Sequence, residues 1–162
     1  MKNQKKILLS FVGTNDAGKL IGKNDGAILT ALKKQKFDEV ILLWNRTQIG
    51  EVKYEKVVKY LKREIMKRKY ASKISDKEFK LSDVTDHNQI YLKLKEFTDT
   101  LPKNKSYSYT AAISSGTPAM QVCWTLFAES GDFTETIPLQ LIKIKDPNGY
   151  EIELAEVFGS GL

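Results

Sequence analysis

The stretch 113-ISSGTPAM-120 joins a strand-like segment, Tyr107–Ile113, to a helix-like segment, Pro118–Glu129. Gly116 permits a tight turn, and Pro118 fits the first position of a helix because its φ is already helical and that position needs no N–H donor. The free N–H groups at the start of the helix, with the positive end of the helix dipole, would face the turn. The stretch therefore predicts a seat for an anion such as a phosphate. A simple N-capped turn before a buried helix is the alternative.

A second turn of the same kind lies near the start of the chain. Residues Lys6–Val12 form a continuous apolar run, which is typical of a central strand covered on both faces. The run leads into a long glycine-rich loop, Gly13–Gly26. This loop is not a Walker A motif, because Leu20 stands where that motif requires a serine or threonine, and it is not a dinucleotide fingerprint. Two polar turns of this kind in one chain favour a binding site over capping alone.

The segments between these two turns alternate between strand and helix. We expect strands over Glu39–Trp44 and Glu78–Leu81, and helices over Gly26–Lys36, Glu51–Lys69 and His87–Leu101. Asp25 is the expected cap of the first of these helices.

The C-terminal part changes pattern. Two alternating segments, Pro138–Lys145 and Tyr150–Leu154, flank a strong turn at Asp146–Gly149 and predict a β-hairpin. The predicted fold class is therefore α/β, a Rossmann-like, doubly wound and mainly parallel sheet with a C-terminal antiparallel β-hairpin. In such a sheet the loops after Val12, Trp44 and Ile113 open on one edge, where ligands bind.

Length and composition indicate one domain. The chain has 162 residues, and residues 159–162 are expected to begin a linker. The formal net charge is +6, but most of the excess lies in the helix predicted at Glu51–Lys69, a pattern more typical of a solvated helix face than of a nucleic-acid groove. A single cysteine, no signal peptide and no run long enough to span a membrane predict a disulfide-free, cytoplasmic protein without a membrane partner.

The chain lacks the side chains of the common catalytic and metal sites. Its only histidine, His87, is expected at the surface near a helix start, so neither a zinc site nor a Cys–His nucleophile can be assembled. The carboxylates form no metal-binding pattern, the serines lack a nucleophile elbow, and no cofactor is indicated. Trp124 is expected in the core rather than in a base stack. What remains is a binding site made of backbone amides, hydroxyls and an amide side chain.

With both turns placed, the sequence resembles the CARF domains, the CRISPR-associated Rossmann-fold sensors. The resemblance is carried by Phe11–Asn15 after the first strand and by Ser114–Met120 after the fourth. The second motif resembles the CARF domains that precede the ancillary ribonucleases of type III CRISPR systems. Phe11–Lys19 together with Gln121–Trp124 looks closest to the sensor domain of RtcR, a transcriptional activator of RNA repair.

The resemblance implies a homodimer that binds an RNA-derived ligand across its two-fold axis and controls an effector that is fused to the domain or missing from it. The ligand would be a cyclic oligoadenylate, as in antiviral defence, or an RNA end in the RtcR-like branch. Residues 1–158 would form the CARF-like ligand-sensing domain. The residues expected to bind the ligand are Gly13, Thr14, Asn15, Lys19, Asn45, Ser114, Ser115, Gly116, Thr117, Pro118 and Met120.

Cleavage of the ligand is the less favoured outcome. CARF proteins that cut their cyclic ligand often carry a basic residue directly after Gly-Thr, where this chain has Pro118, and a proline cannot neutralise developing negative charge. Cleavage would then depend on in-line positioning of a ribose 2′-OH by Thr14, Asn15 or Ser114. Two alternatives to a sensor stay open: a stand-alone, metal-independent ring nuclease that degrades cyclic oligoadenylate, and a nucleotide-binding interaction domain unrelated to CRISPR.

Overall fold

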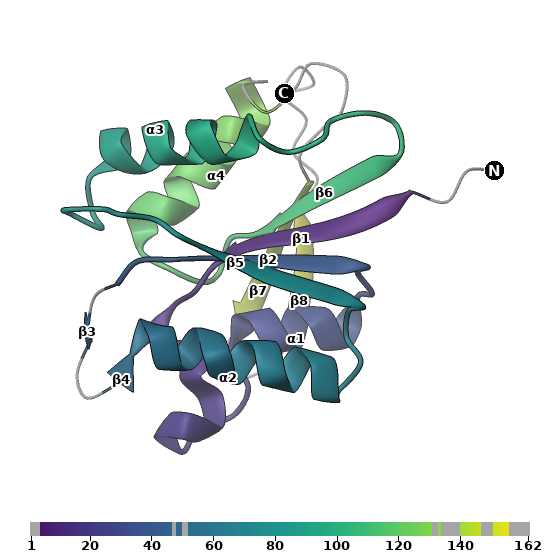
Figure 1. Cartoon of the computed structure of the whole chain (residues 1–162), viewed down its shortest axis with the longest axis vertical. Coiled ribbons are helices and arrows are strands. Elements are labelled where there is room, and N and C mark those ends of the chain that lie inside the picture. The colour runs from purple at the N-terminus through teal and green to yellow at the C-terminus, as the bar shows by residue number, and fades with distance from the viewer. Residues whose placement is uncertain are drawn as a thin grey trace.

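The computed structural model describes residues 4–46, 48–49, 52–130, 133, 140–146 and 151–155. They form a sheet with helices on both faces (Figure 1). Within the described ranges, no helix has both the length and the apolar character needed to cross a membrane.

The six-stranded sheet has the order β5-β2-β1-β6-β7-β8. Its strands are β1 (Lys5–Phe11), β2 (Glu39–Trp44), β5 (Lys73–Glu78), β6 (Tyr107–Ala112), β7 (Gln140–Asp146) and β8 (Glu151–Ala155). Neighbouring strands from β5 to β7 pair parallel, and β8 pairs antiparallel with β7. The prediction of a Rossmann-like, mainly parallel sheet is confirmed.

The helices form two layers. Figure 1 shows α1 (Ala27–Lys34) and α2 (Tyr54–Lys67) on one face of the sheet and α3 (His87–Thr98) and α4 (Pro118–Ser130) on the other. Strand β1 contributes side chains to the core on each face of the sheet. Ile7, Leu9 and Phe11 belong to the core under α3 and α4, and Leu8 belongs to the core under α1 and α2. This alternation explains why the run reads as continuously apolar.

The order of the strands reverses at β1. The chain moves from β1 to β2 and β5 on one side, then returns to β6 on the other side of β1. The loops that leave the carboxyl ends of β1 and β6 therefore run to opposite faces, and ligands of open α/β sheets bind at such a switch point. These are the two loops that carry the motifs.

Two segments differ from the prediction. The strand expected at Glu78–Leu81 lies earlier, at Lys73–Glu78, because it is an edge strand whose polar sequence, KISDKE, carries no apolar signal. Phe79 and Leu81, which suggested a strand, are buried beyond its end. The segment expected as a glycine-rich loop instead begins with a 3₁₀ helix, η1 (Thr14–Ile21).

A short antiparallel pair, β3 (Gln48–Ile49) and β4 (Val52–Lys53), precedes α2 and has no counterpart in the prediction. The turn predicted at Asp146–Gly149 lies outside the described residues after Asp146, and the linker predicted at 159–162 lies outside them altogether.

Candidate functional site

A cavity of about 780 Å³ opens at the carboxyl ends of β1 and β6. It is lined by residues 13–16, 22–27 and 114–116, so both sequence motifs contribute to one hollow. Three separate parts of the chain meet here: the loop after β1, the segment before α1 and the turn before α4. The switch point of the sheet is thus the place where a ligand would lie.

The two loops touch through their backbones. A Cβ atom on Gly13 would lie 2.7 Å from the backbone nitrogen of Gly116, which is closer than side-chain carbons approach other atoms. Gly116 itself has a φ of +97°, and a Cβ there would lie 2.8 Å from the sulfur of Met120. Glycine at these positions permits both the close approach of the loops and the left-handed turn.

The start of α4 follows the prediction. Pro118 is the first residue of the helix, and Thr117 caps it: its hydroxyl oxygen accepts a hydrogen bond from the Met120 amide at 3.3 Å. The same hydroxyl donates to the carbonyl of Val84 at 2.8 Å, which ties the turn to the segment before α3. Thr117 is therefore the N-cap of α4, and its hydroxyl already has two partners.

Asp16 connects all three parts of the cavity wall. Its side chain is buried, and its carboxylate accepts hydrogen bonds from the Gly13 amide at 2.8 Å and from the Ile28 amide in the first turn of α1 at 3.1 Å. The Ser115 side chain lies near the same carboxylate and lowers its pKa. Burial raises the pKa of Asp16, although the hydrogen bonds oppose that shift.

Sequence reasoning did not single out Asp16. A signal existed, because an acidic residue three positions after an N-cap is the second half of a capping box, and η1 has that arrangement with Gly13 as its N-cap. The same bond explains why this segment starts as a helix rather than as an open loop.

Asp25, expected to cap α1, is an ion-pair partner instead. The N-cap of α1 is Gly26, and the Asp25 carboxylate accepts hydrogen bonds from both terminal nitrogens of Arg68, at 2.7 and 3.1 Å. A largely buried guanidinium needs a bidentate carboxylate, and this requirement draws Asp25 away from the helix start. Of the two carboxylates that line the cavity, Asp25 is thereby paired with Arg68, and Asp16 is buried against the amides of Gly13 and Ile28.

Six of the eleven residues expected to bind the ligand line this cavity, and five do not. Those that line it are Gly13, Thr14, Asn15, Ser114, Ser115 and Gly116. Lys19, Asn45, Thr117, Pro118 and Met120 lie outside its wall. Met120 is buried in the core and its amide is bonded to Thr117, whereas Pro118 is exposed at the start of α4.

A known protein family matches nearly the whole of this chain. The family model described as "RtcR: Regulator of RNA terminal phosphate cyclase" matches residues 4–157. The chain belongs to the RtcR family. No curated protein matches its sequence.

A solved structure agrees with the fold of this RtcR-family chain. It is the Csm6 protein of Enterococcus italicus, described as bound to cyclic hexa-2′-fluoro-hexa-dAMP. The two share a TM-score of 0.68 and 19% sequence identity over 90% of this chain and 35% of the Csm6 chain. The chain thus spans about a third of that protein, and the likeness is one of fold. Together with the family match, it confirms the predicted resemblance to CARF domains.

The loop after β2 in this RtcR-family chain is tied down beside the cavity. Asn45 is buried and donates from its amide nitrogen to the carbonyls of Phe79 at 2.7 Å and Leu81 at 3.3 Å. Its side chain therefore holds the segment after β5 in place. The loop opens on the carboxyl edge, as predicted from the topology, but Asn45 faces inward.

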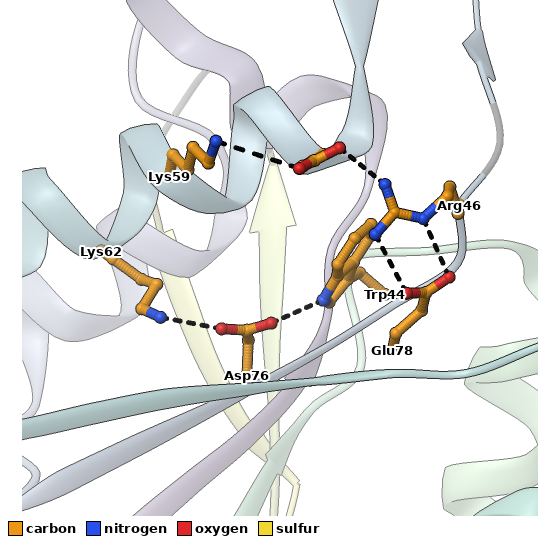
Figure 2. Close-up of polar contacts among 7 residues, drawn as sticks. Trp44, Arg46, Lys59, Lys62, Asp76 and Glu78 are labelled. Atoms are coloured by element: carbon orange, nitrogen blue, oxygen red, sulfur yellow. Dashed lines mark hydrogen bonds and ion pairs between the residues drawn. The ribbon is translucent and has the colours of Figure 1, made fainter.

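Arg46 fastens the same loop from outside. Its guanidinium donates two hydrogen bonds of 3.1 Å to Glu78 (Figure 2) and one of 2.6 Å to Glu55. The guanidinium also lies 4.9 Å from the ring centre of Trp44, in a cation–π contact. The indole N–H of Trp44 in turn donates to Asp76 at 2.8 Å. These contacts join β2, β5 and the start of α2 at one side of the site.

The remaining candidate side chains offer little chemistry. His87 is exposed at the start of α3, as predicted, and Trp124 is fully buried in the core. Cys123 is buried, and burial raises its pKa to about 11, so it is a poor nucleophile at neutral pH. Among the described residues, no three potential metal ligands gather. The wall of the cavity carries the hydroxyls of Thr14, Ser114 and Ser115 and the side-chain amides of Asn15 and Asn24.

Proposed function

We propose that this chain is a ligand-sensing regulatory domain whose cavity binds a cyclic oligoadenylate or a related RNA-derived phosphodiester. The observation that carries the proposal is the meeting of the loops after β1 and β6 in one hollow at the switch point of the sheet. The family match and the Csm6 structure, described as bound to a cyclic hexanucleotide, support a ligand of this class.

The roles follow from position and chemistry. Ser114 and the backbone around Gly116 bind phosphate oxygens, because backbone N–H groups next to a helix N-terminus favour anions. Thr14 and Asn15 are exposed at the rim, where a hydroxyl and an amide suit ribose hydroxyls. Asp16 and Ser115 do not reach out to the ligand; they keep the two loops together.

The domain acts as a homodimer that controls an effector. A cyclic oligonucleotide has repeated phosphates, and two copies of the cavity related by a two-fold axis would match that repeat. The effector is a domain fused to this one or a separate chain.

Calorimetry with a panel of ligands tests the proposal. The panel contains cyclic tetra-adenylate, cyclic hexa-adenylate, a short RNA ending in a 2′,3′-cyclic phosphate and AMP. Saturable binding of a cyclic oligoadenylate or of the RNA end, but not of AMP, supports it. Binding of AMP as tightly as the others would favour a general nucleotide-binding domain, and no binding by any of the four would overturn the proposal.

A matched pair of variants locates the binding. Asn15→Ala removes an exposed amide at the cavity rim, whereas Asn88→Ala removes an exposed amide from α3, outside the cavity wall. Loss of one hydrogen bond to the ligand weakens affinity by about 0.5–1.5 kcal/mol in the first variant only. Equal affinities in both variants would remove Asn15 from the site. Chromatography of the ligand recovered in the presence of EDTA then separates sensing from metal-independent cleavage.

A further inference from the structure

A second hollow, of about 600 Å³, adjoins the candidate cavity. It lies between η1, α1 and α2, and residues 23–25 line both hollows. The segment that leads from η1 to α1 therefore lies at the boundary of both hollows, which are side by side. Nothing in the proposed function uses this second hollow.

The second hollow is strongly cationic. Eight of its ten lining residues are charged: six are basic and two are acidic, an excess of four positive charges. They are Lys19, Lys23, Lys33, Lys34, Lys67 and Arg68, with Asp25 and Glu64.

Both acidic residues of the hollow form ion pairs with one arginine, Arg68. Arg68 lies 2.7 Å from the Asp25 carboxylate and 3.0 Å from the Glu64 carboxylate. Across the described ranges, no ion pair joins any of the five lysines of the hollow to a carboxylate. Their charges are therefore free to attract an anion.

Other lysines of α2 behave differently. Lys62 is paired with Asp76 at 2.8 Å, and Lys59 approaches Glu55 at 3.9 Å (Figure 2). Two lysines of α2 thus have carboxylate partners, whereas Lys67, which lines the hollow, has none among the described residues.

The chemistry of the wall indicates the kind of ligand. Lysines bind phosphates as point charges through flexible stems, which suits a chain whose phosphates are not held in one fixed geometry. No aromatic side chain lines the hollow, so bases have no ring on which to stack. The hollow is suited to a sugar–phosphate backbone, independent of base sequence.

We propose that the second hollow binds the backbone phosphates of a linear, single-stranded RNA whose terminal nucleotide occupies the first cavity. This inference rests on the proposed function, because it needs the first cavity to hold an RNA-derived phosphodiester. It favours a linear RNA with one end in the cavity over a closed ring, which has no strand to extend along the lysines.

The test compares two RNAs that end in the same 2′,3′-cyclic phosphate, a dinucleotide and an octanucleotide of uridine. Binding to each is measured by calorimetry for the whole chain and for the double variant Lys33→Gln/Lys34→Gln. Both lysines are exposed, lie at the end of α1 and line only the second hollow. The control is Lys6→Gln/Lys105→Gln, which removes the same charge from exposed sites near the amino ends of β1 and β6.

The proposal predicts that the octanucleotide binds more tightly than the dinucleotide to the unaltered chain. In the Lys33→Gln/Lys34→Gln variant, octanucleotide affinity falls on the order of tenfold, and the slope of log affinity against log salt becomes shallower by about 1.4, at about 0.7 for each RNA phosphate that a lysine no longer neutralises. Dinucleotide affinity does not change. The control variant binds both RNAs as the unaltered chain does.

The contrary results are distinct from a failure of the proposed function. Equal affinity for the two RNAs, or an equal loss in test and control variants, would overturn the role of the hollow while leaving the cavity as a site. Binding of a cyclic oligoadenylate with no binding of either RNA would do the same. If neither RNA nor ring binds, the proposed function fails and this inference fails with it.

Discussion

Removal of the Asp16 side chain should separate the two loops of the site. In Asp16→Ala the amides of Gly13 and Ile28, which now donate to the carboxylate at 2.8 and 3.1 Å, lose their acceptor in a buried place. Each buried donor left unpaired costs about 1–3 kcal/mol, and relief from burying the carboxyl group itself offsets part of the total. We expect the free energy of unfolding to fall by about 3 kcal/mol.

Thermal unfolding followed by circular dichroism measures this loss. For a domain of this size, about 1 kcal/mol corresponds to about 2–4 °C, so the melting temperature should fall by about 6–12 °C. Hydrogen exchange adds a local readout, since the amides of Gly13 and Ile28 should exchange faster than the rest of the core. Ligand affinity should fall as well, because the cavity wall loses its connection.

Asp83→Ala is the matched control. The Asp83 carboxylate also accepts from a backbone amide and a hydroxyl, both of Thr85, at 2.9 and 2.6 Å, but it is exposed, so water replaces it. This variant should melt close to the unaltered chain. If Asp16→Ala and Asp83→Ala melted at the same temperature, the reasoning that Asp16 holds the loops together would be refuted.

Three further predictions concern the same loops. Gly116→Ala should destabilise the chain by about 2–4 kcal/mol in thermal unfolding, because alanine disfavours the left-handed φ and its Cβ would lie too close to the sulfur of Met120. Gly22 is also left-handed but has open space around it, so Gly22→Ala should cost about 1 kcal/mol. Equal losses in the two variants would contradict the close-contact argument. Thr117→Ala should cost about 1–2 kcal/mol, because α4 loses its N-cap and the turn loses its bond to Val84, and an unchanged melting temperature would show that this cap is dispensable. Burial raises the pKa of Asp16 above 3.8, so the folded chain holds the proton of this carboxyl group more tightly than the unfolded chain does. The contribution of this proton to stability is therefore full below pH 3.8 and is lost as the pH rises through the folded-state pKa. Asp16→Asn should flatten that part of the curve of stability against pH, and a curve identical to that of the unaltered chain would argue against the shift.

The sequence predicted those features that depend on neighbours along the chain. The apolar run of β1 identified a central strand, and Pro118 was correctly identified as the first residue of α4. The alternation of strands and helices was enough for the parallel sheet, because right-handed crossovers leave few arrangements. The prediction that two polar turns meet at one edge follows from that topology, and the cavity lies there.

Features that depend on distant partners could not be predicted in this way. The role of Asp16 needs Gly13, Ser115 and the start of α1 to meet, and Asp25 is drawn from its helix by an arginine that lies 43 positions later. Strand β5 is polar because it lies at the edge of the sheet, and its position in the sheet, not its sequence, makes it a strand. Asn45 has the residue type of a ligand-binding group, yet its amide is used by the carbonyls of Phe79 and Leu81.

The central claim is that ligand binds between the loops that follow β1 and β6. The most direct measurement is the change of backbone amide chemical shifts in ¹⁵N-labelled protein during titration with the tightest ligand of the panel. We predict that the largest changes fall on residues 13–16 and 114–116, with further changes at Lys33, Lys34 and Lys67 when the ligand is a linear RNA, and that residues 77–80 at the end of β5 stay unchanged. Largest changes at 77–80, with the two loops unaffected, would contradict the claim.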